Sequence, residues 1–81
     1  ADIRCRYGQA LLALDQVNAA EEQFRTALEI NPRYADAWAY LGIALRRLSN
    51  EESAKAAFEQ ALSLDAHHIV ASVEITRLKA N

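Results

Sequence analysis

The sequence contains little cysteine, no excess of basic charge and no long apolar run. Its single cysteine permits no internal disulfide, so side-chain packing must stabilise the fold. Nine lysines and arginines stand against eleven aspartates and glutamates, and the net charge of −2 provides no positive field for a phosphate backbone. No apolar run approaches the roughly 18 residues of a membrane span, and the N-terminus lacks the basic-then-apolar order of a signal peptide. These absences argue against nucleic acid and membranes as partners, and they favour a cytoplasmic location.

An internal repeat fills most of the chain. Ten positions within residues 1–34 hold the same residue 34 places later, and only four of the ten are alanines, so the composition does not explain the match. The ten first members are Ala1, Asp2, Gly8, Ala10, Leu11, Leu14, Ala20, Phe24, Ala27 and Leu28. A fixed period of this size is typical of stacked repeat arrays.

Each repeat carries two helical patterns of apolar residues. In the second copy these patterns lie on either side of a polar break at residues 49–52, and they consist of Trp38, Leu41, Leu45 and Leu48, then Ala54, Phe58, Ala61 and Leu62. Gly42 lies inside the first pattern, where glycine costs about 1 kcal/mol of helix stability relative to alanine. We therefore expect Gly42 to serve close packing against the small Ala54 and Ala61. The sequence predicts an all-α protein with five helices near residues 2–14, 18–30, 35–48, 52–64 and 67–80.

Polar residues mark the expected helix starts. Asn18 and Glu21 have the spacing of a capping box for the second helix, and Ser49 or Asn50 can cap the fourth. Asn31 is expected to cap the third helix, with Pro32 in its first turn. Asp65 takes the place of Asn31 one repeat later, so the fifth helix should begin near residue 66.

The first helix has one apolar stripe, which we expect to face the core. The stripe consists of Ile3, Tyr7, Ala10, Leu11 and Leu14.

The spacing of the packing residues resembles a known family. Trp38, Leu41-Gly42, Ala54, Phe58 and Ala61 stand at the intervals of the tetratricopeptide repeat. The first copy keeps part of this pattern, namely Gly8, Ala20, Phe24, Ala27 and Pro32, whereas Leu11 and Leu45 replace the family's tyrosine and Ala66 replaces its second proline. The resemblance implies an α-solenoid of antiparallel helical hairpins that winds as a right-handed superhelix. It divides the chain into repeat 1 at residues 1–34, repeat 2 at residues 35–68 and a further helix at residues 67–80.

Residues 67–80 are expected to form a capping helix with a polar outer side. Thr76 stands where Gly8 and Gly42 stood, and Lys79 stands where Leu11 and Leu45 did. Both positions would face the partner helix of a complete hairpin, so their polarity fits the end of an array. A single domain over residues 1–81 with little more than two repeats is short for a stable array, because about three repeats are usually needed. With no initial methionine, excision from a longer protein or a processed N-terminus is expected.

The candidates for chemistry are few. His67 and His68 with Asp65 and Glu74 offer zinc-type ligands, but adjacent helical residues point about 100° apart, and solvated residues at a helix start explain the histidines as well. Cys5 would need a nearby base, and both histidines lie far along the stack, so we expect a partly buried, inert thiol. No catalytic residue, metal or cofactor is expected, and the protein is predicted not to be an enzyme.

The family resemblance implies a groove lined by outward positions of the first helix in each hairpin. These candidate peptide-binding residues are Asp2, Cys5, Arg6, Gln9, Leu12, Asp36, Ala39, Tyr40, Ile43, Arg46, Val70, Val73, Glu74 and Arg77. Family members that grip a chaperone's C-terminal carboxylate use basic residues and asparagines where this chain has Cys5, Gln9, Tyr40, Val70 and Glu74. Because no cation stands there and Glu74 would repel a carboxylate, we expect no such clamp. Tyr40 and Ile43 are instead expected to supply apolar anchors, and Arg46 a charge-assisted hydrogen bond.

The sequence favours a protein-interaction scaffold that binds a peptide or helix in this groove, and it does not identify the partner. Two alternatives remain open. One is a structural segment that associates with itself or with the rest of its parent through the end faces at residues 4–11 and 70–78. The other is a regulatory arm of a multidomain enzyme.

Overall fold

A computed structural model describes residues 2–80, of which Lys79 and Ala80 are described by their backbone alone. Within this range the chain forms five α-helices and no strand. They are α1 (Asp2–Ala13), α2 (Val17–Ile30), α3 (Ala35–Arg47), α4 (Glu51–Leu64) and α5 (Ile69–Ala80). The all-α prediction is therefore confirmed, with each helix end within two residues of the predicted position.

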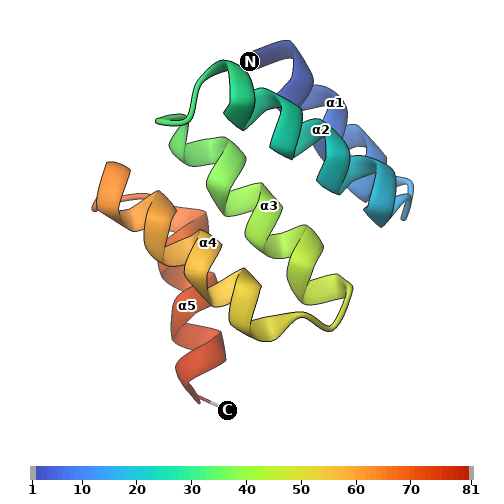
Figure 1. The fold of residues 1–81 in the computed structure, drawn as a ribbon. Coiled ribbons are helices and arrows are strands. Elements are labelled where there is room, and N and C mark those ends of the chain that lie inside the picture. Colours follow the sequence, from blue (N-terminus) through green and yellow to red (C-terminus); the bar gives the residue numbers. More distant parts are fainter. Residues whose placement is uncertain (1, 81) are drawn as a thin grey trace.

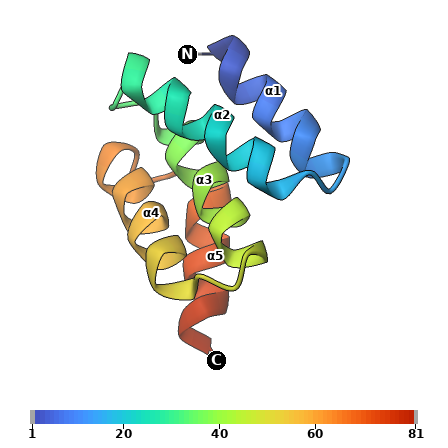
Figure 2. The same cartoon turned by 45° about the vertical axis from the view of Figure 1, so that its right-hand side comes forward.

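The helices form two antiparallel hairpins and one further helix (Figure 1). The first hairpin consists of α1 and α2, the second of α3 and α4, and α5 runs back alongside α4. Helix α3 is central, because it contacts all four other helices. Turned by 45°, the molecule shows α1 at one end of the stack and α5 at the other (Figure 2). This order is that of an α-helical repeat array.

A phenylalanine ring lies directly on a glycine inside each hairpin. A Cβ atom built on Gly42 would stand 2.5 Å from Phe58 Cε1, and one on Gly8 would stand 2.5 Å from Phe24 Cε1. Both rings are fully buried. The predicted close packing at Gly42 is confirmed, and the nearest side chain is the ring of Phe58. Ala54 and Ala61, which were expected to form the opposing surface, are also buried.

Small residues fill much of the remaining core. Nine alanines are buried among the described residues, and they are Ala20, Ala27, Ala37, Ala39, Ala44, Ala54, Ala57, Ala61 and Ala71. Short side chains let neighbouring helix axes approach, because the distance between two packed helices depends on the side chains at the contact. Inside each hairpin, one phenylalanine then supplies the largest fully buried side chain, Phe24 in the first and Phe58 in the second.

The turn inside each hairpin uses a left-handed residue that is not glycine. Asp15 has φ 63° and Ser49, its equivalent one repeat later, has φ 64°. The next residue in each turn bonds back to the helix, from Gln16 N to Leu11 O at 2.8 Å and from Asn50 N to Leu45 O at 2.9 Å. This backbone bond closes the C-terminal end of a helix in the Schellman motif. The same backbone turn therefore starts the second helix of both hairpins.

The predicted inward stripe of α1 is largely wrong. The buried residues of α1 are Cys5, Gly8, Leu11 and Leu12, whereas Ile3, Tyr7, Ala10 and Leu14 are exposed. The reason is tertiary, because α2 packs against the side of α1 that carries the glycine. The apolar stripe lies on a different side, which no other described helix covers.

The predicted side-chain caps are also wrong in part. Helix α2 follows Gln16 without a side-chain cap, so the capping box of Asn18 does not form, and Asn50 precedes α4 at the predicted position but makes no cap hydrogen bond. Asn31 ends α2 and does not start α3, since its Oδ1 accepts from the Arg33 backbone N–H at 3.2 Å.

The connection from repeat 2 to α5 repeats this local turn. Asp65 Oδ1 accepts from the His67 N–H at 3.2 Å, as Asn31 does from Arg33 one repeat earlier. In such an Asx turn, the side chain bonds to the backbone two residues on and keeps these residues in a turn instead of a helix. For this reason α5 begins at Ile69 and not near residue 66.

The contact between glycine and phenylalanine can be tested with Gly42→Ala. The added methyl group overpacks the ring of Phe58 at a cost of about 1–3 kcal/mol, which offsets or exceeds the gain of roughly 1 kcal/mol in helix propensity. We expect the free energy of unfolding, measured by urea denaturation, to fall by up to about 2 kcal/mol. In a Phe58→Leu background the same substitution should be neutral or stabilising. Equal effects in both backgrounds would contradict the contact.

Candidate functional site

Helix α3 presents two further faces between those that contact α2 and α4. Since successive residues turn by about 100°, Trp38, Leu41 and Leu45 share one face, and Ile43 and Arg47 lie on the opposite one. A groove lies along each face. We call them the outer groove and the α3–α5 groove.

The α3–α5 groove has a volume of about 330 Å³. Helix α3 supplies Ile43, Arg46 and Arg47, and α5 supplies Ile69, Val70, Val73, Glu74 and Arg77. Ile69 and Val73 are exposed and Ile43 and Val70 are half-buried, so an aliphatic strip runs through the groove. Exposed apolar side chains that are gathered in a hollow are typical of binding sites.

A charged cluster lies beside the aliphatic strip. Glu74 is buried, and its carboxylate forms ion pairs with Arg46 Nη2 at 2.9 Å and with Arg77 Nη1 at 3.5 Å. Arg46 Nε is buried without a hydrogen-bond partner among the described residues. With Arg47 included, three guanidinium groups stand against one carboxylate, so the groove carries an excess of positive charge. The expectation that Glu74 would repel a carboxylate is therefore wrong, because its charge is already compensated.

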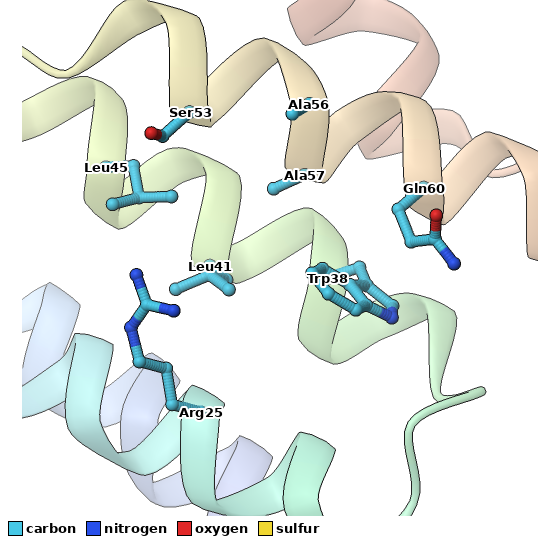
Figure 3. A pocket seen from close by; sticks show the side chains of 8 residues that line it. All are labelled: Arg25, Trp38, Leu41, Leu45, Ser53, Ala56, Ala57 and Gln60. Atoms are coloured by element: carbon cyan, nitrogen blue, oxygen red, sulfur yellow. The ribbon is translucent and has the colours of Figure 1, made fainter.

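The outer groove lies between α2 and α4, with α3 as its floor (Figure 3). Its volume is also about 330 Å³, and its lining consists of Arg25, Trp38, Leu41, Leu45, Ser53, Ala56, Ala57 and Gln60. The guanidinium of Arg25 extends from α2 toward Leu41, and Trp38 lies farther along α3 (Figure 3).

Two polar side chains of the outer groove, those of Trp38 and Arg25, have partners within the protein. The Trp38 indole N–H donates to Pro32 O at 2.9 Å, and Arg25 Nη2 lies 2.8 Å from a carboxylate oxygen of Glu21. Groups that already have partners gain less from a ligand than groups that have none.

Family comparisons agree with this architecture. A model described as tetratricopeptide repeat matches residues 35–68, and one described as TPR repeat matches residues 8–49, which is half of the chain. The chain belongs to the tetratricopeptide repeat family. Repeats of this family generally mediate protein–protein interaction, and the family is typically a non-catalytic module. No helix among residues 2–80 has the length and hydropathy that crossing a bilayer requires.

A similar protein occurs in an archaeon. An uncharacterized protein of Methanocaldococcus jannaschii is 41% identical over 51 residues, which cover 63% of this chain and 59% of that protein. The chain thus spans about three fifths of the curated relative that it matches.

Six of the fourteen candidate residues line the α3–α5 groove of this tetratricopeptide array. They are Ile43, Arg46, Val70, Val73, Glu74 and Arg77. Three others, Cys5, Leu12 and Ala39, are buried between helices, so their side chains do not face a groove. Their outward assignment came from the family resemblance, which does not show where a neighbouring helix of this chain lies.

The remaining five candidates lie outside this lining. On α1 these are Asp2, Arg6 and Gln9, and on α3 they are Asp36 and Tyr40. The Tyr40 ring stacks on Phe24 with centroids 6.0 Å apart and is half-buried, so it belongs partly to the packing between repeats.

Two groove residues were missed from the sequence, Arg47 and Ile69. Arg47 Nη1 also donates to Leu12 O at 3.0 Å, and it thereby satisfies a carbonyl at the C-terminal end of α1. The available signal was the run of two arginines at the end of α3. Nothing in the helical spacing indicated that the second of them would reach back to the first repeat.

Asp2 and Asp36 hold consecutive repeats together. Tyr34, directly before α3, donates its hydroxyl hydrogen bond to Asp2 Oδ1 at 2.8 Å. His68, directly before α5, lies with Nε2 2.6 Å from Asp36 Oδ1. The second pair occupies the positions of the first pair one repeat later, so the same joint occurs twice with different chemistry. Burial and the hydrogen bond to Asp2 raise the pKa of the Tyr34 phenol, which therefore stays a donor.

The expectation that His68 is a solvated residue is wrong. His68 is buried, and its Nδ1 accepts from the Ala71 backbone N–H at 3.3 Å. Because Nδ1 is an acceptor, the proton of the neutral ring is on Nε2, which donates to Asp36. His68 thus caps the start of α5 and joins it to α3. No group of three metal-ligating side chains occurs among the described residues.

Cys5 is buried in the first hairpin. Gln9 Nε2 donates to its Sγ at 3.7 Å, but burial outweighs this bond and raises the pKa of the thiol, with a smaller contribution from Asp36. A thiol with a raised pKa and no access to solvent is a poor nucleophile.

The joint at α5 can be tested with His68→Ala. This substitution removes the cap of α5 and leaves Asp36 without its partner, so we expect a loss of about 1–3 kcal/mol in the free energy of unfolding. Tyr34→Phe removes one exposed hydrogen bond at the other joint, and its expected cost is about 0.5–1.5 kcal/mol. Urea denaturation measures both. If His68→Ala proved as mild as Tyr34→Phe, the double role of His68 would be contradicted.

The burial of Cys5 predicts slow alkylation. At neutral pH, iodoacetamide should modify Cys5 in the folded protein at least about tenfold more slowly than in urea, because the raised pKa and the burial both suppress the exposed thiolate. Mass spectrometry of timed samples measures the rates. Equal rates in buffer and in urea would show that the thiol is accessible.

Proposed function

We propose that this chain is a protein-interaction scaffold that binds a peptide or a helix in the α3–α5 groove. The observation that supports the proposal is the aliphatic strip with arginines beside it, in one hollow of about 330 Å³. Apolar hollows with a few convergent polar groups are the usual form of a binding site. The general role of tetratricopeptide repeats in protein–protein interaction points in the same direction.

The groove favours a partner segment with an aliphatic and an acidic side chain. The aliphatic side chain would pack on Ile69 and Val73, which are exposed in the free protein. The carboxylate would pair with Arg77, which is largely exposed and lies at 3.5 Å from Glu74, longer than a strong ion pair. Arg46 is more closely held by Glu74, so its contribution is chiefly to keep that carboxylate neutralised.

The partner's C-terminal carboxylate is not the recognised group in this proposal. Of the positions that such a clamp would use, Cys5 is buried and Glu74 is held between arginines. The side-chain carboxylate of an internal aspartate or glutamate can pair with the arginines as well as a C-terminal carboxylate can. The groove should therefore bind peptides with a free or an amidated C-terminus equally.

A fluorescent peptide with alternating leucine and glutamate residues tests the groove. Arg77→Ala should weaken binding by about fivefold to tenfold, since it removes one exposed charge-assisted hydrogen bond. Val73→Asp should weaken binding further, because it places a carboxylate in the aliphatic strip. Fluorescence anisotropy measures the dissociation constants.

Arg6→Ala is the matched control, because Arg6 is an exposed arginine outside the groove. Its affinity should equal that of the parent protein, and amidation of the peptide should change nothing. Trp38 emission separates the two grooves, since this residue lines only the outer one. Binding that shifts Trp38 emission and ignores Arg77→Ala would move the site to the outer groove and contradict the proposal.

A further inference from the structure

Helix α1 carries an apolar stripe that no described part of the chain covers. Ile3, Tyr7 and Leu14 are 82%, 54% and 68% exposed, and Ala10 between them is exposed as well. The Leu14 N–H donates to Ala10 O at 3.1 Å, so the helical path continues to Leu14. Steps of four, three and four residues place all four side chains on one side of a helix. We call these residues the α1 stripe.

Three of the four equivalent positions one repeat later, Ala37, Leu41 and Ala44, are covered by a neighbouring helix, and the fourth, Leu48, is 37% exposed. Ala37 and Leu41 on α3, the equivalents of Ile3 and Tyr7 one repeat later, are 0% and 2% exposed where α2 packs against α3. Ala71 on α5 is likewise buried where α4 packs against α5. In this fold, then, this side of the helix is a surface for helix packing. On α1 it bears larger apolar residues than on α3, and a contiguous exposed apolar surface marks an interaction site.

We propose that the α1 stripe packs against the α1 stripe of a second copy of this chain, with the two helices antiparallel. This inference is independent of the α3–α5 groove. A twofold interface requires that each contact from one residue to another is matched by the reverse contact. The stripe meets this condition, because its residues lie symmetrically about the midpoint between Gly8 and Gln9.

The sizes of the residues fit this pairing. In the antiparallel arrangement, Tyr7 of each copy lies opposite Ala10 of the other, so the largest side chain of the stripe meets the smallest. Ile3 lies opposite Leu14 at both ends of the pair. The spacing is that of the apolar seam in two-stranded coiled coils.

The charges favour the antiparallel orientation. Arg4 and Arg6 lie in the first half of α1, where Asp2 is paired with Arg6 at 3.8 Å, and residues 9–14 carry no charged side chain. An antiparallel pair places the arginines of each copy beside the uncharged half of the other. A parallel pair would bring the arginines of the two copies together, and like charges at close range destabilise a contact.

One helix pair buries less than the roughly 1,200 Å² of a stable interface, so a weak dimer is expected. Sedimentation equilibrium of the 81-residue chain between about 10 μM and about 1 mM should show an average mass that rises with concentration. Tyr7→Glu or Leu14→Glu should raise the dissociation constant at least about tenfold. Ile30→Glu, at an exposed isoleucine on α2, is the matched control and should leave it unchanged.

Disulfide trapping tests the orientation. With Ile3→Cys and Leu14→Cys combined in one chain, oxidised glutathione should yield a covalent dimer. The reason is that position 3 of each copy lies opposite position 14 of the other copy. Either substitution alone should yield none. Circular dichroism checks that these exposed substitutions leave the helices intact.

Three results would overturn the proposal. A protein that stays monomeric up to about 1 mM leaves the stripe to another occupant, such as the second helix of a further tetratricopeptide hairpin. Cross-linking by each single variant would show a parallel pair. Association that Tyr7→Glu does not weaken would place the interface elsewhere on the molecule.

Discussion

The contact of a phenylalanine ring with a glycine backbone determines how each hairpin closes. Phe24 and Phe58 are fully buried on Gly8 and Gly42, at a distance that leaves no room for a side chain. Glycine inside a helix costs about 1 kcal/mol, and burying a phenylalanine contributes about 1.5–3 kcal/mol, so the exchange is favourable. Because the contact recurs at the same positions of the second repeat, both hairpins close in the same way. The later helices can then stack on them in an equivalent manner.

The joints between repeats use the same positions with different side chains. Asp2 accepts from Tyr34, and Asp36 accepts from His68. In each case a residue directly before a helix reaches back to the first turn of the corresponding helix one repeat earlier. His68 also accepts from the backbone of Ala71, so the second joint includes a helix cap that a tyrosine could not supply. The joints fix the angle between consecutive hairpins, and this angle determines the shape of the grooves.

The position of α3 explains how one helix both packs against its neighbours and lines two grooves. Two of its faces are buried against α2 and α4, and the two faces between them line grooves. The grooves differ in charge balance. Arg25 in the outer groove is paired with Glu21, whereas the α3–α5 groove is lined by three arginines, two of which are paired with its single carboxylate, Glu74. The proposed recognition of an acidic segment therefore involves the groove whose cations exceed its anions.

The sequence by itself determined the helices and the residues inside each hairpin. Helical periodicity and the internal repeat can be read from the order of residues alone, so the helix ends were predicted within two residues, and Phe24, Phe58 and Gly42 were assigned correctly to close packing. Six of the fourteen groove residues that the family resemblance implied line the α3–α5 groove. Only the tertiary structure decided which side of α1 is buried, since helical spacing does not reveal where the next helix packs. The tertiary structure also brought Arg46 to Glu74 and Asp36 to His68. In both pairs α4 separates the two residues in the sequence, so their distance depends on how α5 packs relative to α3.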